Sequence, residues 1–152
     1  MTHQPTDVLP DTEVRQLGRF VSRTDHRTMS EEARMELKKR ILDTIGVAIG
    51  ALDGEPIRMI REHLDDFGGN GLCTLIGGGK TAPDRAAFYN GALSRYLDFM
   101  DSYLAKGETC HQSDNFGDVL AAAEYADAGG GDFLSAMAAA YQVQGRLCDV
   151  AP

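Results

Sequence analysis

The segment from Ser30 to Leu52 constrains the fold most strongly, because it combines a helix start with a long helical repeat of apolar residues. Ser30 favours the N-cap position, and Glu31 and Glu32 place negative charge in the first turn, where the helix dipole stabilises it. The apolar residues that follow at helical spacing are Leu37, Ile41, Leu42, Ile45, Ala48, Ile49 and Leu52. Asp53-Gly54 then marks the end of the predicted helix.

The second half of this helix, residues 41–52, is apolar on nearly every side. A helix without a polar face belongs in the interior of a protein. We therefore expect it to be the central helix of a bundle, with Gly46 and Gly50 allowing a neighbouring helix to approach closely.

Five further segments begin with a helix start signal and continue with apolar residues at helical spacing. Their expected starts are Asp11-Thr12, Pro56, Thr81 with Pro83, Ser113 or Asp114, and Asp132. Residues 73–76 are expected to form at most one short extended segment. The predicted fold class is therefore all-α, a helical bundle that forms a single domain over residues 1–152, with residues 1–10 flexible.

The charge of the chain argues against two classes of partner. There are 23 acidic and 15 basic residues, which give a formal net charge of -8. Such a chain repels the phosphates of nucleic acids and of anionic membranes, so we expect neither as a partner. No stretch approaches the roughly 20 apolar residues of a membrane span, and the polar first thirty residues do not form a signal peptide.

The three cysteines indicate a reducing compartment. Cys73, Cys110 and Cys148 make neither an even disulfide set nor a CxxC metal motif. We therefore expect a cytoplasmic protein. No complete set of transition-metal ligands is present, so no metal site is expected.

The loop predicted between the fourth and fifth helices carries the candidate chemistry. Asp98 and Asp101 are three residues apart, so on a continuing helical turn both carboxylates would project to one side. His111 follows in the same loop, and a carboxylate facing an imidazole is the minimum equipment for moving protons on and off a substrate. Ser102 adds a neutral hydrogen-bond donor.

Two further residues of this loop suit an anionic ligand. Lys106 supplies a positive charge for a substrate carboxylate, and Ser113 lies at the expected start of the next helix, where the dipole favours a bound anion. The simpler alternative is that Asp98 and Asp114 only cap helices and that His111 is a hydrogen-bonded surface residue. Composition alone favours that alternative.

Four stretches carry a family resemblance: LDTIGVAIGAL at 42–52, AAFYNGALSRYLDFMDSYLA at 86–105, HQSDNFGDVLAAAEY at 111–125 and DFLSAMAAAYQVQGRL at 132–147. In this order they resemble the MmgE/PrpD family, which contains 2-methylcitrate dehydratase, cis-aconitate decarboxylase and iminodisuccinate epimerase. The spacing through the loop is most similar to the dehydratase branch.

The resemblance implies a helical domain followed by a smaller α+β domain, with the active site in the cleft between them and no metal or organic cofactor. The chain corresponds to the first, helical domain, and the second domain is expected to be absent from it. By position, Asp98, Ser102 and His111 match the catalytic aspartate, hydroxyl residue and histidine of the family, while Asp101, Lys106 and Ser113 are expected to bind substrate.

Two residues depart from the family pattern. Gln112 replaces the usual proline after the histidine, which frees the backbone and is expected to loosen the aim of the imidazole. Met100 replaces an acidic residue beside the site.

The resemblance implies a hydro-lyase that dehydrates a small polycarboxylate such as 2-methylcitrate, with weak or no activity for this chain alone. Activities like those of cis-aconitate decarboxylase or iminodisuccinate epimerase are the alternatives within the family. Outside it, the alternatives are a non-catalytic helical module that dimerises and one subunit of a split enzyme. A homodimer through the helical domain is expected in either case.

Overall fold

The computed structural model describes residues 11–151, and the predicted flexibility of residues 1–10 lies outside them. Within this part of the chain six α-helices dominate, which confirms the all-α prediction. They are α1 Glu13–Arg23, α2 Glu31–Gly50, α3 Glu55–Phe67, α4 Pro83–Tyr96, α5 Phe116–Tyr125 and α6 Gly130–Val150. Two short 3-10 helices, η1 His26–Thr28 and η2 Gln112–Asn115, precede α2 and α5. None of the helices in residues 11–151 is long and apolar enough to cross a membrane.

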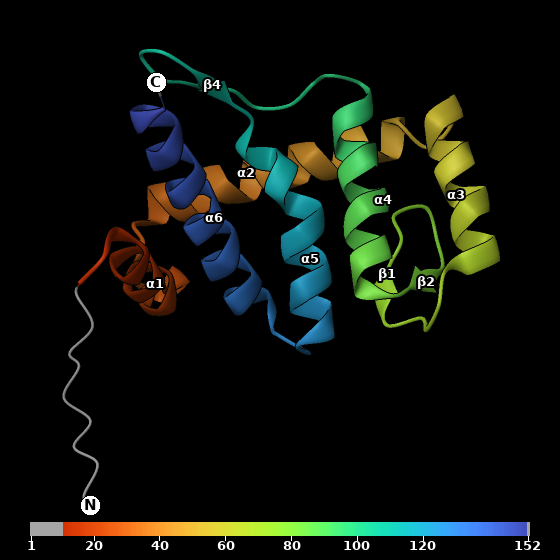
Figure 1. The fold of residues 1–152 in the computed structure, drawn as a ribbon, viewed down its shortest axis with the longest axis horizontal. Helices are drawn as coiled ribbons and strands as arrows, with labels where there is room; N and C mark the ends of the chain where they lie inside the picture. The colour runs from red at the N-terminus through yellow and green to blue at the C-terminus, as the bar shows by residue number, and fades with distance from the viewer. Residues whose placement is uncertain (1–10, 152) are drawn as a thin grey trace, which may run out of the picture.

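The helices form a compact arrangement around two clusters of buried side chains. Helices α4, α5 and α6 lie side by side, α2 crosses behind them, α3 flanks α4, and α1 packs against α6 (Figure 1). One cluster joins α2, α3 and α4 through Ala48, Ile57 and Leu93, and the other joins α2, α5 and α6 through Leu37, Phe116 and Met137.

Local sequence signals predict three of the helix starts correctly. The Thr12 hydroxyl accepts a hydrogen bond from Arg15 N at 3.4 Å before α1, and the Ser30 hydroxyl accepts one from Ala33 N at 3.1 Å before α2. Proline lies in the first turn of α3, as expected from its fixed φ angle.

The start of α4 differs from the prediction because Thr81 has a tertiary partner. Thr81 lies in a strand and its hydroxyl donates to the Gly68 carbonyl, so it does not cap the helix. Ala82 occupies the N-cap position instead, and Pro83 is the first helical residue.

The starts of α5 and α6 are also displaced. Ser113 and Asp114 do not cap α5, because they belong to η2, and Asn115 holds the N-cap position. Helix α6 begins at Gly130, two residues before the expected Asp132, with Gly129 as its N-cap.

Helix α2 is not surrounded by protein, contrary to the prediction. Leu42 is 70% exposed and Ile49 is 56% exposed. A Cβ at Gly46 would meet nothing within 4 Å, whereas one at Gly50 would lie 3.2 Å from the Leu97 side chain. The other helices pack on one side of α2 only, so its apolar sequence leaves one face bare.

The closest approach between two helices occurs at a glycine that the sequence did not single out. A Cβ at Gly117 of α5 would lie 2.7 Å from both the Ala87 carbonyl oxygen and the Gly91 nitrogen of α4. These are backbone atoms, so α4 and α5 depend on the missing side chain to pack as they do.

Four short strands form two hairpins, where at most one extended segment was expected. β1 Cys73–Thr74 pairs with β2 Lys80–Thr81, and the buried Asn90 side chain holds this turn by accepting from Ile76 N at 3.0 Å. β3 Tyr103–Leu104 pairs with β4 Thr109–Cys110 inside the loop predicted to carry the site. Each strand is two residues long, too short for alternation in the sequence to reveal it.

Candidate functional site

The loop between α4 and α5 carries all six residues that the sequence nominated. It runs from the end of α4 across to the end of α6 before it turns into α5 (Figure 1). The helical turn expected to align Asp98 with Asp101 does not exist, because α4 ends at Tyr96 and Asp98 has a positive φ of 58°. The loop therefore has to be positioned by contacts outside α4.

Helix α6 supplies most of those contacts. Gln112 Nε2 donates to the Tyr141 carbonyl at 2.6 Å, and Gln144 Nε2 donates to the His111 carbonyl at 3.4 Å. Asn115 Nδ2 donates to Gln144 Oε1 at 2.5 Å. Gln112, expected to loosen the histidine, instead fastens the neighbouring backbone to α6.

Asp101 joins the two ends of the loop. Its Oδ1 accepts from Ser113 N at 2.9 Å, and its Oδ2 forms an ion pair with Arg40 Nη1 of α2 at 3.4 Å. The Asp101 carbonyl lies 2.7 Å from His111 Nδ1. The Asp101 side chain is only 10% exposed, and both of its oxygens are occupied by protein groups.

The Asp101 carbonyl also determines which imidazole nitrogen is basic. A carbonyl oxygen only accepts hydrogen bonds, so His111 Nδ1 must carry the proton in this contact. In the neutral ring Nε2 is then the nitrogen that can take up a proton. Ser102 Oγ lies 3.4 Å from the same Nδ1, which places the hydroxyl beside the ring.

Two buried hydroxyls lie next to this cluster. Ser113 Oγ and Tyr141 Oη are buried and make no hydrogen bond of good geometry within residues 11–151. Burial, and then the nearby Asp101 carboxylate, raise the pKa of Tyr141 well above its usual range. Tyr141 is therefore a neutral donor that faces the carboxylate.

Sequence reasoning missed Arg40 and Tyr141. Arg40 is 61 residues from Asp101 in the chain, and Tyr141 has the spacing of an apolar core position on α6. No local pattern marks either of them, because only the tertiary fold brings α2 and α6 to the loop.

The structure leaves two nominated residues outside the cluster. Lys106 is exposed at the tip of the hairpin between β3 and β4. Asp98 is exposed, and no hydrogen bond or ion pair in the described part of the chain joins its side chain to Asp101, Ser102 or His111.

A groove of about 830 Å³ borders the loop on the side of Asp98. Leu97 and Phe99, the neighbours of Asp98, line one wall, and residues of α2 line the other. The α2 residues are Lys39, Leu42, Asp43, Gly46 and Val47, which surround the position of Arg40. The groove and the Asp101 ion pair therefore share the same turns of α2.

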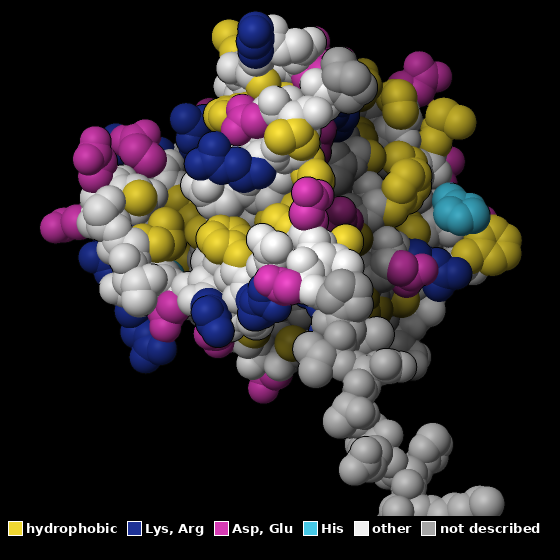
Figure 2. Space-filling view, turned by 60° about the vertical axis from the view of Figure 1, so that its left-hand side comes forward, with side chains coloured by type: hydrophobic (Ala, Val, Ile, Leu, Met, Phe, Trp, Pro, Cys, Tyr) yellow, Lys and Arg dark blue, Asp and Glu magenta, His cyan; other side chains and the backbone are white. Residues whose placement is uncertain are grey.

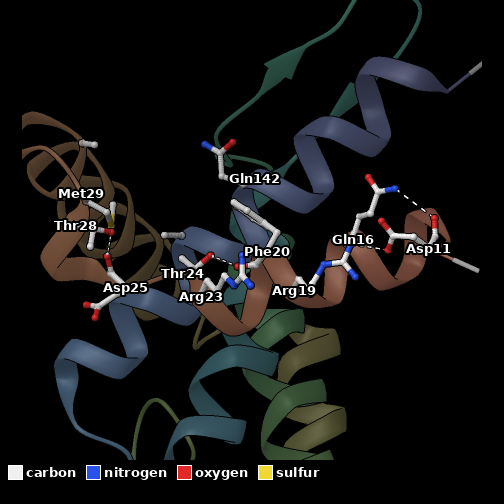
Figure 3. Close-up of a pocket in the computed structure, with 12 residues that line it drawn as sticks. Asp11, Gln16, Arg19, Phe20, Arg23, Thr24, Asp25, Thr28, Met29 and Gln142 are labelled. Atoms are coloured by element: carbon white, nitrogen blue, oxygen red, sulfur yellow. Dashed lines mark hydrogen bonds and ion pairs between the residues drawn. The ribbon is translucent and has the colours of Figure 1, made fainter. Parts of the chain in front are cut away.

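A second groove, of about 720 Å³, lies between α1 and the rest of the protein (Figure 3). Three of its charged lining groups are already paired: Arg19 contacts Asp11 at 2.5 Å, and hydrogen bonds from Arg27 lower the pKa of Asp25 to about 2. None of the six nominated residues lines it. The loop cluster is therefore the better candidate site.

Within residues 11–151, no group of three or more His, Cys, Asp and Glu side chains is arranged to hold a metal ion. The cluster itself offers an imidazole nitrogen that can accept a proton, a hydroxyl beside the ring, and the Asp101 backbone carbonyl that orients the ring.

The chain was compared with models of known protein families, and one of them matches. The model of the MmgE/PrpD N-terminal domain matches residues 15–152, which is nearly the whole chain. The match spans α2 to α6, all of α1 except its first two residues, and the loop with Asp98, Ser102 and His111. The chain belongs to the MmgE/PrpD family, of which it carries the N-terminal domain.

Proposed function

We propose that the chain supplies the first-domain half of the active site of a hydro-lyase of the 2-methylcitrate dehydratase type. The contact between His111 Nδ1 and the Asp101 carbonyl at 2.7 Å carries this proposal. The contact fixes a proton on Nδ1 and leaves Nε2 as the nitrogen that can accept one, which is the role needed to remove a proton next to a substrate carboxylate.

In the proposed reaction a base removes the proton α to a carboxylate while an acid assists departure of the hydroxyl as water. We assign the base to His111 and the acid to Asp98, with Ser102 orienting the substrate. Lys106 and Ser113 are proposed to contact substrate carboxylates. Asp101 acts mainly by positioning, because its oxygens already bind Ser113 N and Arg40.

We expect little turnover from this chain alone. The N-terminal domain taken by itself supplies only part of the proposed site, and part of a site gives less substrate orientation and charge stabilisation than the whole. The natural alternatives within the family use related polycarboxylates, so 2-methylcitrate, cis-aconitate and iminodisuccinate should be compared. The product distinguishes loss of water, loss of carbon dioxide and epimerisation.

The test combines turnover with binding. The purified chain is titrated with 2-methylcitrate while the imidazole resonances are followed by NMR, and water loss is measured from the absorbance of the unsaturated product. We expect the His111 resonances to shift and those of the exposed His63 to stay unchanged. Residual turnover should disappear in His111→Ala and persist in His63→Ala.

Two results would contradict the proposal. One is a polycarboxylate titration that leaves His111 unperturbed while another part of the chain responds. The other is dehydration that survives His111→Ala at the rate of the unaltered chain.

We also propose that the chain forms a homodimer through its helices. Apolar side chains are exposed on α2 and on α1, where Val14 is 77% exposed. Figure 2 shows one face of the molecule, on which hydrophobic side chains lie between side chains of both charges. Covering such side chains favours association, and the same property supports the alternative of a non-catalytic dimerising module.

A cytoplasmic location completes the proposal. It is supported by three free cysteines, of which Cys73 and Cys148 are buried and Cys110 is half-buried.

A further inference from the structure

One face of the loop hairpin lies against the last turns of α6. Tyr103 of β3 and Cys110 of β4 are antiparallel partners, so their side chains project to the same face of the hairpin. From that face the Tyr103 hydroxyl donates to Asp149 Oδ1 at 2.8 Å. Cys110 is therefore directed toward the same end of α6.

The residue of α6 that meets Cys110 is Cys148. Cys148 directly precedes Asp149 and is 7% exposed, while Cys110 is half-buried. Strand β4, which carries Cys110, packs against α6, and Cys148 is close enough to raise the pKa of the Cys110 thiol. The tip of the hairpin approaches the same helix end, since a Cβ at Gly107 would lie 3.8 Å from the Ala151 carbonyl oxygen.

The third cysteine has a different environment. Cys73 has no exposed surface, and its thiol donates to the Ala121 carbonyl at 3.3 Å in the cluster between α2, α3 and α4. It therefore provides an internal control for the reactivity of the other two.

We propose that Cys110 and Cys148 are a redox modification site, at which a small disulfide such as oxidised glutathione converts the two thiols into an intramolecular disulfide between the loop and α6.

The reaction proceeds by two thiol–disulfide exchanges. The more exposed Cys110 attacks as the thiolate and forms a mixed disulfide, releasing one glutathione thiol. The Cys148 thiolate then attacks Cys110 Sγ and releases the second. The two protein thiols lose two protons and two electrons, and oxidised glutathione is reduced to two glutathione molecules.

The environment of the pair sets the rate of this reaction. Burial and the neighbouring Cys148 raise the pKa of Cys110 to about 11. Cys110 is therefore protonated at neutral pH, and the first exchange is slow. The thiolate fraction, and with it the initial rate, should rise about tenfold per unit of pH between about pH 7 and 9.

The disulfide would restrict the movement of His111, which lies next to Cys110 in the chain. Cys110 is adjacent to His111, so a covalent bond to α6 removes freedom from the strand that carries the imidazole. The proposal does not depend on the hydro-lyase assignment, because its readout is a covalent bond.

The experiment is peptide mapping of the folded chain after incubation with oxidised glutathione. Free thiols are blocked with iodoacetamide, and the digest is analysed by mass spectrometry without reduction. We expect one linked peptide pair containing Cys110 and Cys148, lighter by two hydrogens than the reduced pair, while Cys73 is alkylated only after unfolding.

Two variants with circular dichroism spectra matched to the unaltered chain serve as controls. Cys73→Ser should form the same disulfide at the same rate. Cys148→Ser should stop at the glutathione adduct of Cys110, and Cys148→Ala provides a second replacement if the serine disturbs folding.

Three outcomes would overturn the proposal. They are a glutathione adduct on Cys110 that persists in the unaltered chain, participation of Cys73 in the linked pair, and disulfides formed only between molecules on a non-reducing gel.

Discussion

At the scale of single residues, Asp101 performs two tasks through different atoms. Its carbonyl fixes the proton on His111 Nδ1, and its carboxylate receives Ser113 N and Arg40. A side chain that satisfies its own protein neighbours has little capacity left for a ligand. This favours positioning over the substrate contact expected from the loop sequence.

Asp101→Asn should lower the pKa of Tyr141, because it removes a negative charge that opposes ionisation of the phenol. Burial remains, so the pKa should stay above the ordinary value of 10.0. An ultraviolet pH titration of the folded chain measures this, with Tyr141→Phe identifying the signal. An unchanged titration would show that the carboxylate does not act on Tyr141.

Tyr141 also determines how the stability of the fold changes at alkaline pH. The pKa of Tyr141 is raised in the folded chain, so its contribution to stability is fully present below about pH 10 and is lost as the pH rises beyond it. Tyr141→Phe should therefore be less sensitive to alkaline unfolding than the unaltered chain.

At the scale of elements, the sequence predicts a helix start correctly where the capping bond joins residues close together in the chain. Helices α1 and α2 begin where Thr12 and Ser30 cap them, because a side chain and a backbone N–H three residues away suffice for that bond. Thr81 has the same chemistry but finds the Gly68 carbonyl instead. That partner belongs to the end of α3, and no sequence pattern near Thr81 reveals it.

In the candidate site too, the sequence predicts residues that are near one another in the chain and misses those that only the fold brings in. Ser102, His111 and Ser113 lie close together in the chain and were found as a loop motif, whereas Arg40 and Tyr141 arrive from α2 and α6. A pattern within one loop carries no information about which distant helices will support it. The roles assigned to Asp98 and Lys106 stay predictions.

Substituting two glycines tests how closely the helices pack at each position. Gly117→Ala should destabilise the fold by about 1–3 kcal/mol, since its methyl group would meet backbone of α4 at 2.7 Å. Gly46→Ala should stabilise it by up to about 1 kcal/mol, because alanine is the better helix former and the space around it is open. Urea unfolding compares the two, and equal effects would mean that α4 and α5 do not pack as described.

At the scale of the whole molecule, the bare face of α2 is the main unexplained surface. Leu42 is 70% exposed and lines the groove beside the loop, together with Phe99, which is also 70% exposed. A helix that is apolar all round is expected to be covered on all sides. The exposed apolar face of α2 is therefore the surface on which the proposed homodimer can be tested.

Leu42→Lys should weaken self-association without unfolding the chain, because the side chain is already in water. Light scattering over a range of concentrations measures this. Met59→Lys is the matched control, since Met59 is 64% exposed but belongs to a different helix, α3. A chain that is monomeric before substitution, or equal weakening by both variants, would rule out a dimer through α2.

Helix α6 supports both the loop and the groove beside α1. It holds the backbone of His111, the thiol of Cys148 and, through Gln142, one wall of the α1 groove (Figure 3). A rigid helix transmits a small tilt along its whole length. Occupation of the loop should thus be sensed at α1, because Gln142 lies between Tyr141 and Gln144, the two residues of α6 that hold the loop. A fluorophore attached to α1 would report it.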